Sequence, residues 1–232
     1  MHKKVKRKFR KERYIAIGFF TLVIFILGAL LGTIIEKKRV DALSYESKVI
    51  DIDYKSNQLQ YQYFDTLEET NESCKVLPKV IEISMDTLSE SLEKVVNYRD
   101  EGLLNDKEYE LLERKYLLDN LKYWMFSNKA NKKCNKDVVT VLYFYSDEEC
   151  DVCPNQGVIL TYYKKILQDE LLVFPVNIDV LNEPLIDLLE VSYNVSDLPY
   201  VVIDEKGHSG FITKSKMHDL LCATNKSINI MC

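Results

Sequence analysis

Two cysteines, Cys150 and Cys153, follow the β-rich run Val138–Tyr145 after a short gap. Thiols at this spacing fit in the first turn of a helix, where unpaired backbone N–H groups and the helix dipole favour a thiolate. The second thiol is then near enough to attack a mixed disulfide that the first has formed. A strand, a short loop and a cysteine pair that opens a helix are the layout that a dithiol redox centre needs.

The residues around this pair alternate between strand-like and helix-like patterns. After the run at 138–145 we expect a helix through 158–167, a strand at 171–179, a helix at 184–193, a strand at 200–203, a turn at 204–207, a strand at 209–212 and a helix at 213–221. Within that turn, Gly207 suits a left-handed backbone position. The order β-α-β-α-β-β-α begins with a βαβ unit, which implies two parallel strands with helices on the sheet faces, followed by an antiparallel hairpin.

This order, with Cys-x-x-Cys after the first strand, resembles the thioredoxin fold over roughly residues 138–221. The segment Tyr193–Ile203 resembles the family's approach to its cis-proline strand, which implies that Pro199 is cis and faces the cysteine pair. A cis proline removes an N–H and exposes the preceding backbone to an extended substrate chain. An ordinary trans proline at a strand start is the alternative.

The sequence departs from the thioredoxin pattern around the cysteines. Glu149 stands where a Trp usually precedes the first cysteine, Asp151-Val152 replace Gly-Pro, and Phe144 occupies the position of a buried carboxylate six residues before Cys150. The acidic side chains beside Cys150 raise a thiol pKa and oppose the helix dipole. A mildly reducing or slow dithiol, or a structural disulfide, fits this setting better than a strong oxidant.

The N-terminal region contains an uncharged stretch at residues 14–35, after a basic tail at 1–13. As a helix these 22 residues would be roughly 33 Å long, close to one bilayer core. A cleaved signal peptide is the competing interpretation, but no small-residue cleavage site follows. Eight Lys and Arg residues precede the stretch and three follow it closely, so the positive-inside rule predicts a single-pass cell-membrane protein with a cytoplasmic N-terminus and an extracytoplasmic C-terminal domain.

The charge of the remaining chain excludes one class of partner. Apart from those eleven basic residues, Glu12 and Glu36, twenty basic and 34 acidic residues remain, a net charge near −14. Such an acidic domain argues against binding to nucleic acid or anionic lipid.

Between the predicted membrane helix and the α/β domain we expect helices. Residues 36–73 form a stalk with a weak coiled-coil-like stripe of Val40, Leu43, Ile50, Tyr54, Tyr61 and Phe64. Residues 74–134 form an antiparallel hairpin, with one helix starting near Pro78 and the other running from Asp106 to about Asn128. Cys74 and Cys134 are equidistant from the turn and should meet as a disulfide, although two unrelated thiols are the alternative.

The other chemical assignments for the cysteines are weaker. Zinc would need two further ligands, and only His2, His208 and His218 are present. A c-type haem needs a His after the second cysteine, where Pro154 stands. We therefore predict no metal and no cofactor. Cys222 and Cys232 flank the polar tail at 222–232, and a disulfide, free thiols and an intermolecular link are all open there.

These observations predict a membrane-anchored thiol–disulfide oxidoreductase acting on extracytoplasmic proteins. Cys150 would be the nucleophile and Cys153 the resolving thiol, while Pro199 would face them by the thioredoxin resemblance. Its partners would be the membrane, proteins with thiols or disulfides, and an unidentified redox partner. The alternative is a redox-silent thioredoxin-like adaptor in a membrane assembly that uses the helical bundle as its interface. Sequons at Asn71, Asn194 and Asn225 would accept glycans if the host glycosylates outside the membrane.

Overall fold

The computed structural model describes residues 17–33, isolated positions and short stretches between 52 and 66, and residues 71–101, 106–180 and 183–224. The chain divides into two compact units, Met1–Thr66 and Leu67–Cys232. The basic tail, the stalk stripe and Cys232 lie outside the described residues.

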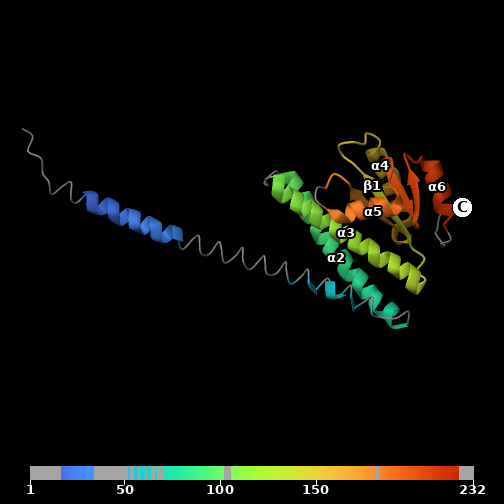
Figure 1. Ribbon diagram of the computed structural model, residues 1–232, viewed down its shortest axis with the longest axis horizontal. Helices are drawn as coiled ribbons and strands as arrows, with labels where there is room; N and C mark the ends of the chain where they lie inside the picture. Colours follow the sequence, from blue (N-terminus) through green and yellow to red (C-terminus); the bar gives the residue numbers. More distant parts are fainter. Residues whose placement is uncertain are drawn as a thin grey trace, which may run out of the picture. The chain divides into compact units, whose positions relative to one another are not determined.

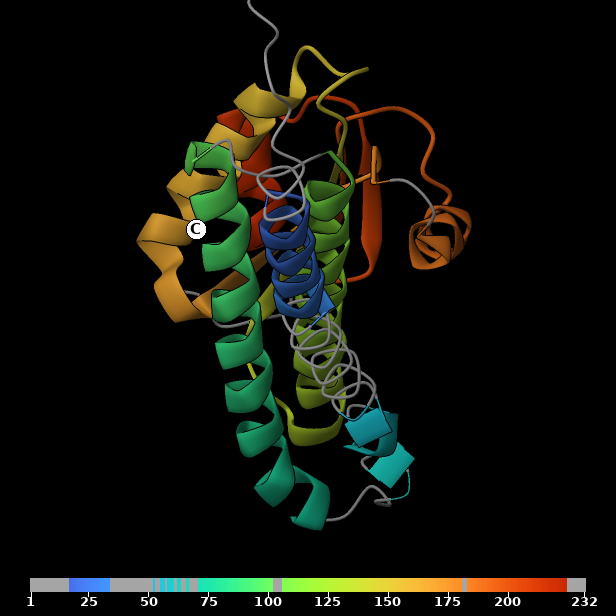
Figure 2. The same ribbon diagram turned by 90° about the vertical axis from the view of Figure 1, so that its left-hand side faces the viewer.

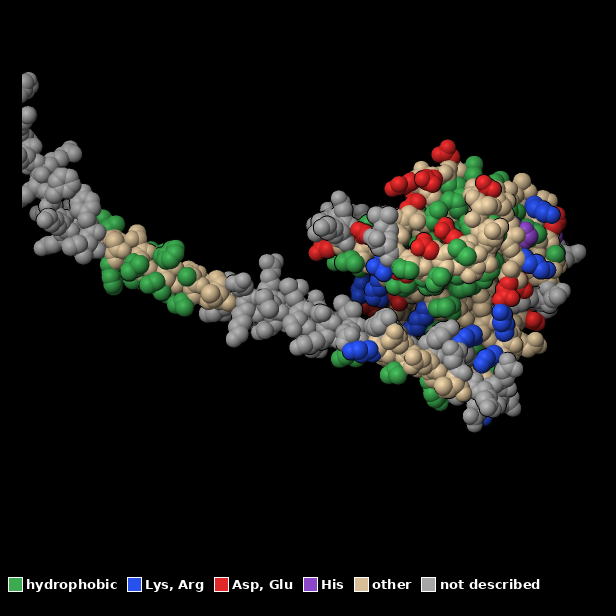
Figure 3. All heavy atoms as spheres, in the orientation of Figure 1, with side chains coloured by type: hydrophobic (Ala, Val, Ile, Leu, Met, Phe, Trp, Pro, Cys, Tyr) green, Lys and Arg blue, Asp and Glu red, His purple; other side chains and the backbone are tan. Residues whose placement is uncertain are grey.

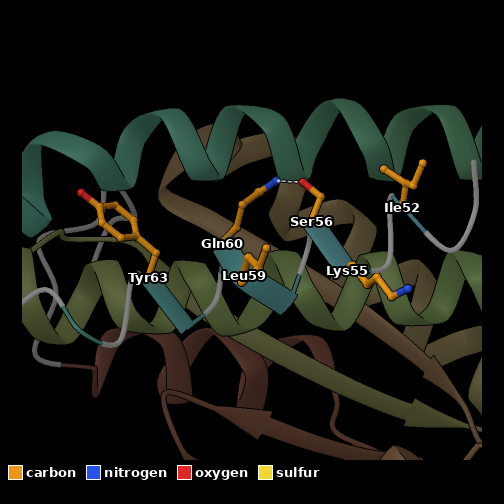
Figure 4. A pocket seen from close by; sticks show the side chains of 6 residues that line it. All are labelled: Ile52, Lys55, Ser56, Leu59, Gln60 and Tyr63. Carbon is orange, nitrogen blue, oxygen red and sulfur yellow. Dashed lines mark hydrogen bonds between the residues drawn. The ribbon is translucent and has the colours of Figure 1, made fainter.

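In the first unit, residues 17–33 form a helix whose large apolar side chains are exposed, among them Phe20 and Phe25. Within the described residues, no helix combines the length and apolar character needed to cross a membrane. The described positions between 52 and 66 are also helical. Figure 4 shows an open hollow on this segment, lined by Ile52, Lys55, Ser56, Leu59, Gln60 and Tyr63.

The second unit is built on a four-stranded sheet in the order β2-β1-β3-β4. Strands β1 (Val139–Tyr145) and β2 (Leu171–Asn177) are parallel, as a βαβ unit requires. Strand β3 (Tyr200–Ile203) pairs antiparallel with β1, and β4 (Lys206–Ser209) pairs antiparallel with β3. Apart from the short turn before β2, the elements from β1 onward follow the order β-α-β-α-β-β-α expected from the sequence.

Helices cover both faces of this sheet (Figure 1). Helix α4 (Cys153–Leu167) and helix α6 (Lys214–Cys222) pack on one face, through Leu160, Tyr163, Met217 and Leu221. Helix α5 (Pro184–Tyr193) packs on the other face, through Ile186 and Leu189. A short 3-10 turn, η1 (Gln168–Glu170), joins α4 to β2. Because both faces of β1 are covered, its sequence is an almost continuous apolar run.

The last hairpin corrects two sequence expectations. We expected a strand at 209–212, with Gly207 in the turn, but β4 spans Lys206–Ser209. Asp204 and Glu205 both adopt positive φ, 49° and 70°, as the two central residues of a tight hairpin turn do. The turn is therefore shorter than expected, and it places Gly207 inside the strand.

The hairpin helices are longer than the sequence indicates. Helix α2 (Asn71–Glu101) begins before Pro78, which lies inside it, and helix α3 (Asp106–Cys134) continues past Asn128. A proline inside a helix removes one hydrogen bond, a loss that this exposed position tolerates. The two helices run side by side (Figure 2), with Leu77 and Val95 of α2 buried.

Helix α3 also covers the α5 face of the sheet. Its Leu117 and Leu121 belong to the same buried cluster as Phe144 and Phe174. The Asn120 side chain donates to the Pro175 carbonyl at 2.8 Å. The hairpin and the sheet consequently share one core and form one compact unit.

A partly buried ion pair joins α3 to the start of α5. Arg114 Nε donates to Glu183 Oε2 at 2.7 Å, and the other oxygen of Glu183 caps α5 by accepting from the Leu185 N–H at 3.2 Å. Glu183 is 8% exposed. The Glu183 carboxylate therefore accepts a backbone N–H of the first turn of α5 and, through Arg114, holds that turn against α3.

Candidate functional site

The cysteine pair lies where β1 leads into α4. Cys150 and Cys153 are joined by a disulfide, with their Cα atoms 5.4 Å apart. The Cys153 N–H donates to the Cys150 carbonyl at 3.3 Å, so the pair forms the turn from which α4 starts. Cys150 is 7% exposed and Cys153 is 1% exposed. Both residues are therefore buried, and Cys150 is the less buried of the two.

A hydrogen-bonded loop of four residues separates β1 from Cys150. The Ser146 hydroxyl donates to Asp179 Oδ1 at 2.7 Å and accepts from the N–H groups of Glu148 (3.1 Å) and Glu149 (2.7 Å). Asp179 Oδ2 accepts from the Asp147 N–H at 2.7 Å and the Glu148 N–H at 3.3 Å. The backbone donors that lead up to Cys150 are thereby satisfied by two side chains.

Tyr143 lies beneath the pair, in the same buried cluster as both cysteines. Its hydroxyl donates to the Cys153 carbonyl at 2.5 Å, and its ring stacks on Tyr145 with centroids 5.3 Å apart. Burial, and then the charge of Asp147, raise the pKa of Tyr143 to about 12. The same two causes, together with smaller ones, raise the pKa of Tyr145 further. Both phenols therefore stay neutral at physiological pH.

The position that we compared with a buried carboxylate lies on the wrong face. Side chains alternate along a strand, and Phe144 faces the α3 and α5 layer while Tyr143 faces the cysteines. The group beneath the pair is thus the phenol of Tyr143, seven positions before Cys150. The aromatic residue at 143 and the strand alternation were the signals that could have identified it.

Pro199 and Gln156 bring two further segments to this end of the sheet. Pro199 is buried, the Leu198–Pro199 bond is cis, and Leu198 packs against the cluster that contains both cysteines. Gln156 is fully buried on α4 and accepts from the Ile212 N–H at 2.8 Å. Its Nε2 has no hydrogen-bond partner within the described part of the chain. Gln156 therefore ties the loop after β4 to the cysteine helix.

Acidic side chains surround the pair, as the sequence indicates. Asp147, Glu148, Glu149 and Asp151 are all exposed. Figure 3 shows acidic side chains gathered over the end of the second unit where Figure 1 places the loop before α4. Their negative charge disfavours a thiolate on Cys150 after reduction, against the effect of the helix N-terminus.

Three other described cysteines, Cys74, Cys134 and Cys222, do not join this site. Cys74 and Cys134 form a disulfide between α2 and α3, with Cα atoms 5.5 Å apart and a sequence separation of 60. Cys222, at the end of α6, is disulfide-bonded. Cys232 lies outside the described residues. Within the described ranges, no group of three His, Cys, Asp or Glu residues is arranged to hold a metal ion.

Sequence reasoning missed Ser146 and Asp179. One signal was present, because Asn177-x-Asp179 ends a strand predicted to be parallel to β1. The carboxyl ends of parallel strands meet at one edge of a sheet. A carboxylate directly after β2 is therefore expected to lie near the loop that follows β1.

No protein-family model and no curated protein match this sequence. Among solved structures, a malarial protein shares 19% identity, over 37% of this chain and 94% of its own, with a TM-score of 0.32. Thioredoxin-2, a component of the malaria parasite's protein secretion machinery, shares 21% identity over 38% and 85%, with a TM-score of 0.33. An uncharacterized thioredoxin-like protein from Clostridium perfringens shares 20% identity over 40% and 76%, with a TM-score of 0.34.

Proposed function

We propose that this protein exchanges thiols and disulfides with other proteins through Cys150 and Cys153. The observation that carries the proposal is the position of the pair: the two cysteines form the turn at the N-terminus of α4, and Cys150 is the less buried of the two. Thiols at a helix N-terminus are those that ionise and react most readily. The low exposure of Cys153 suits a thiol that attacks only an adjacent mixed disulfide.

In the reducing direction the exchange has two steps. The Cys150 thiolate attacks one sulfur of a substrate disulfide, so a mixed disulfide forms and the other substrate sulfur leaves as a thiolate that takes up a proton. Cys153 then loses its proton and attacks the Cys150 sulfur, which releases the second substrate thiol and forms the Cys150–Cys153 disulfide. Two electrons pass to the substrate, and an external dithiol must restore the reduced pair. The oxidising direction is the same sequence reversed.

The acidic surroundings favour a slow or mildly reducing centre over a strong oxidant. A strong oxidant needs a stabilised thiolate in its reduced form. Four exposed carboxylates close to Cys150 work against that stabilisation. The same observation favours the second candidate, a thioredoxin-like adaptor whose Cys150–Cys153 disulfide is redox-silent.

We further propose that residues 14–35 anchor the protein in a membrane, with the second unit outside the cytoplasm. Support comes from the absence of charge across this stretch and from the excess of basic residues before it. The described part, residues 17–33, is helical and exposes apolar side chains. Labelling of introduced cysteines in intact cells tests the orientation, and a second unit shielded from impermeant reagents would refute it.

Insulin reduction with an excess of dithiol is the direct test of exchange. Wild-type protein should accelerate it, and both C150S and C153S should abolish the acceleration. Once excess dithiol has been removed, reduced C153S should accumulate a mixed disulfide with insulin through Cys150, detectable by mass spectrometry, because the resolving thiol is missing. Brief alkylation of the reduced protein should modify Cys150 before Cys153. An inactive wild type whose pair can still be reduced would identify the adaptor instead.

A further inference from the structure

Asp179 is the carboxylate through which the segment after β2 holds the loop before Cys150. It accepts three hydrogen bonds, from the Ser146 hydroxyl and from the N–H groups of Asp147 and Glu148. Ser146 is 1% exposed and accepts from the Glu148 N–H, which it shares with Asp179, and from the Glu149 N–H. Charge-assisted hydrogen bonds of this kind are stronger than those between neutral groups.

Asp179 is itself held in place. Its N–H donates to Asn177 Oδ1 at 2.9 Å, and the Ile178 N–H donates to the Tyr145 carbonyl at 2.9 Å, which extends the pairing of β1 and β2 to this point. Asn177 also donates through Nδ2 to Asp147 Oδ2 at 3.2 Å. The carboxylate therefore acts on the loop from a backbone fixed by the pairing of β1 with β2.

We propose that Asp179, acting with Ser146, is a positioning residue that keeps Cys150 beside Cys153 when their disulfide is open. The inference rests on the proposed exchange function, because only a pair that opens and closes needs such a device. Within the described residues, Asp179 makes no hydrogen bond to either cysteine, so it acts through the loop.

The two redox states depend on the loop differently. In the oxidised state the disulfide holds Cys150 next to Cys153 whatever the loop does. In the reduced state that covalent link is gone, and the hydrogen bonds at 146–149 become a main restraint on Cys150. An ordered loop keeps the effective concentration of the two thiols high, which favours closure of the disulfide and speeds the resolving step.

The test measures the equilibrium between the Cys150–Cys153 disulfide and a glutathione buffer in the folded protein. In D179N the amide nitrogen cannot accept the loop N–H groups, so the reduced pair gains freedom. We expect the equilibrium constant for disulfide formation to fall roughly tenfold, which makes the reduction potential about 30 mV less negative. S146A should change the constant in the same direction, and the double variant should show less than the sum of the two effects.

E148Q is the control for charge. It removes one negative charge from the same loop but keeps Asp179 and Ser146, which accept from the backbone N–H groups. The equilibrium constant for disulfide formation in E148Q should therefore stay within about twofold of wild type. A D179N constant equal to that of wild type, or an E148Q constant as low as that of D179N, overturns the proposal. If D179N does not fold, S146A decides by the same criterion. Insulin reduction by wild type is measured separately, so loss of the exchange function is distinguishable from loss of the positioning role.

Discussion

Tyr143 shows how one buried side chain sets the chemistry beneath the cysteine pair. Its hydroxyl bonds to the Cys153 carbonyl, and its pKa of about 12 keeps it neutral across physiological pH. A buried carboxylate at the same place could exchange a proton with a thiol near neutrality, whereas this phenol cannot. The pH dependence of exchange should therefore follow the cysteines themselves.

The raised pKa of Tyr143 predicts a loss of stability at high pH. The folded pKa of about 12 exceeds the ordinary value of 10.0, so the unfolded state ionises first. The stabilisation is complete below about pH 10 and is lost as the pH rises towards about 12. Y143F should be less stable by about 1 kcal/mol at neutral pH, because the hydrogen bond is lost, but should lose less stability on going to high pH.

Urea unfolding at about pH 8 and about pH 11, followed by circular dichroism, compares the two proteins across most of this window. Other buried tyrosines titrate in both proteins, so the difference between the two slopes isolates Tyr143. A Y143F stability that falls as steeply as that of wild type would show that Tyr143 does not titrate in this way.

The Tyr200 side chain lies so close to position 207 that only a glycine fits there without a shift. A Cβ at this position would lie 2.1 Å from Tyr200 Oη, a hydroxyl that donates to the Tyr193 carbonyl at 2.6 Å. G207A should therefore destabilise the protein by about 1–3 kcal/mol, as overpacked sites do. G157A is the matched control, because the nearest side-chain atom would be Tyr143 Cε1 at 3.9 Å. Thermal unfolding should show no loss for G157A, and equal losses would contradict the steric argument.

Single residues also mark the limit of prediction from sequence. The cysteine pair and Pro199 can be identified from residue type and spacing alone, because that spacing is typical of a dithiol site. Tyr143 and Asp179 do not, because their roles depend on which strand face and which sheet edge they occupy. Gly207 was assigned to the turn by its type, yet Asp204 and Glu205 take the positive φ values.

At the scale of elements, the α2–α3 hairpin is closed by a covalent bond at its open end. The sequence predicted two helices around a turn, and Cys74 and Cys134 at equal distances from it. It did not predict that α2 begins before Pro78, because a proline is most common at a helix start. It also did not predict that α3 covers the sheet, since an apolar stripe does not say which surface it meets.

The two described disulfides should differ in their contribution to stability. The Cys74–Cys134 bond spans a separation of 60 residues and the Cys150–Cys153 bond a separation of 3. In the chain-entropy model the long loop is worth about 4 kcal/mol, and the short one contributes far less. Replacing Cys74 and Cys134 with Ser should therefore lower the melting temperature strongly, while insulin reduction by the folded fraction is kept.

The matched variant replaces Cys150 and Cys153 with Ser, and its melting temperature should be close to that of wild type. In a thiol buffer of increasing strength, Cys150–Cys153 should open first. Loss of activity without loss of stability in the Cys74 and Cys134 variant would instead make the hairpin disulfide part of the electron path.

At the scale of the whole molecule, the described α/β layers and the hairpin cannot be separated without exposing a core. Leu117 and Leu121 of α3 pack with Leu142, Phe144 and Phe174 of the sheet. From the sequence we assigned the hairpin at 74–134 and the thioredoxin-like region at 138–221 to separate segments. The order of the elements along the chain could be predicted from the sequence, but the shared core could not, because it depends on long-range packing.

A fragment of residues 138–232 should therefore not fold by itself. Without α3, the α5 face of the sheet would expose large apolar side chains to water, each costing about 1.5–3 kcal/mol. Residues 67–232, the whole second unit, form the control fragment and should fold. Proton–nitrogen NMR spectra distinguish the two outcomes, and a well-dispersed spectrum from 138–232 would contradict the shared core.

The Cys74–Cys134 bond also determines how a pulling force would travel along the chain. Tension applied from the N-terminal side reaches Cys74, crosses the disulfide to Cys134 and enters β1 five residues later. Residues 75–133 form a side loop that bears no load while the bond is intact. A protein tethered at its N-terminus would thus transmit strain directly to the strand that leads to Cys150. Only after reduction of the hairpin bond would the two long helices unravel and lengthen the tether.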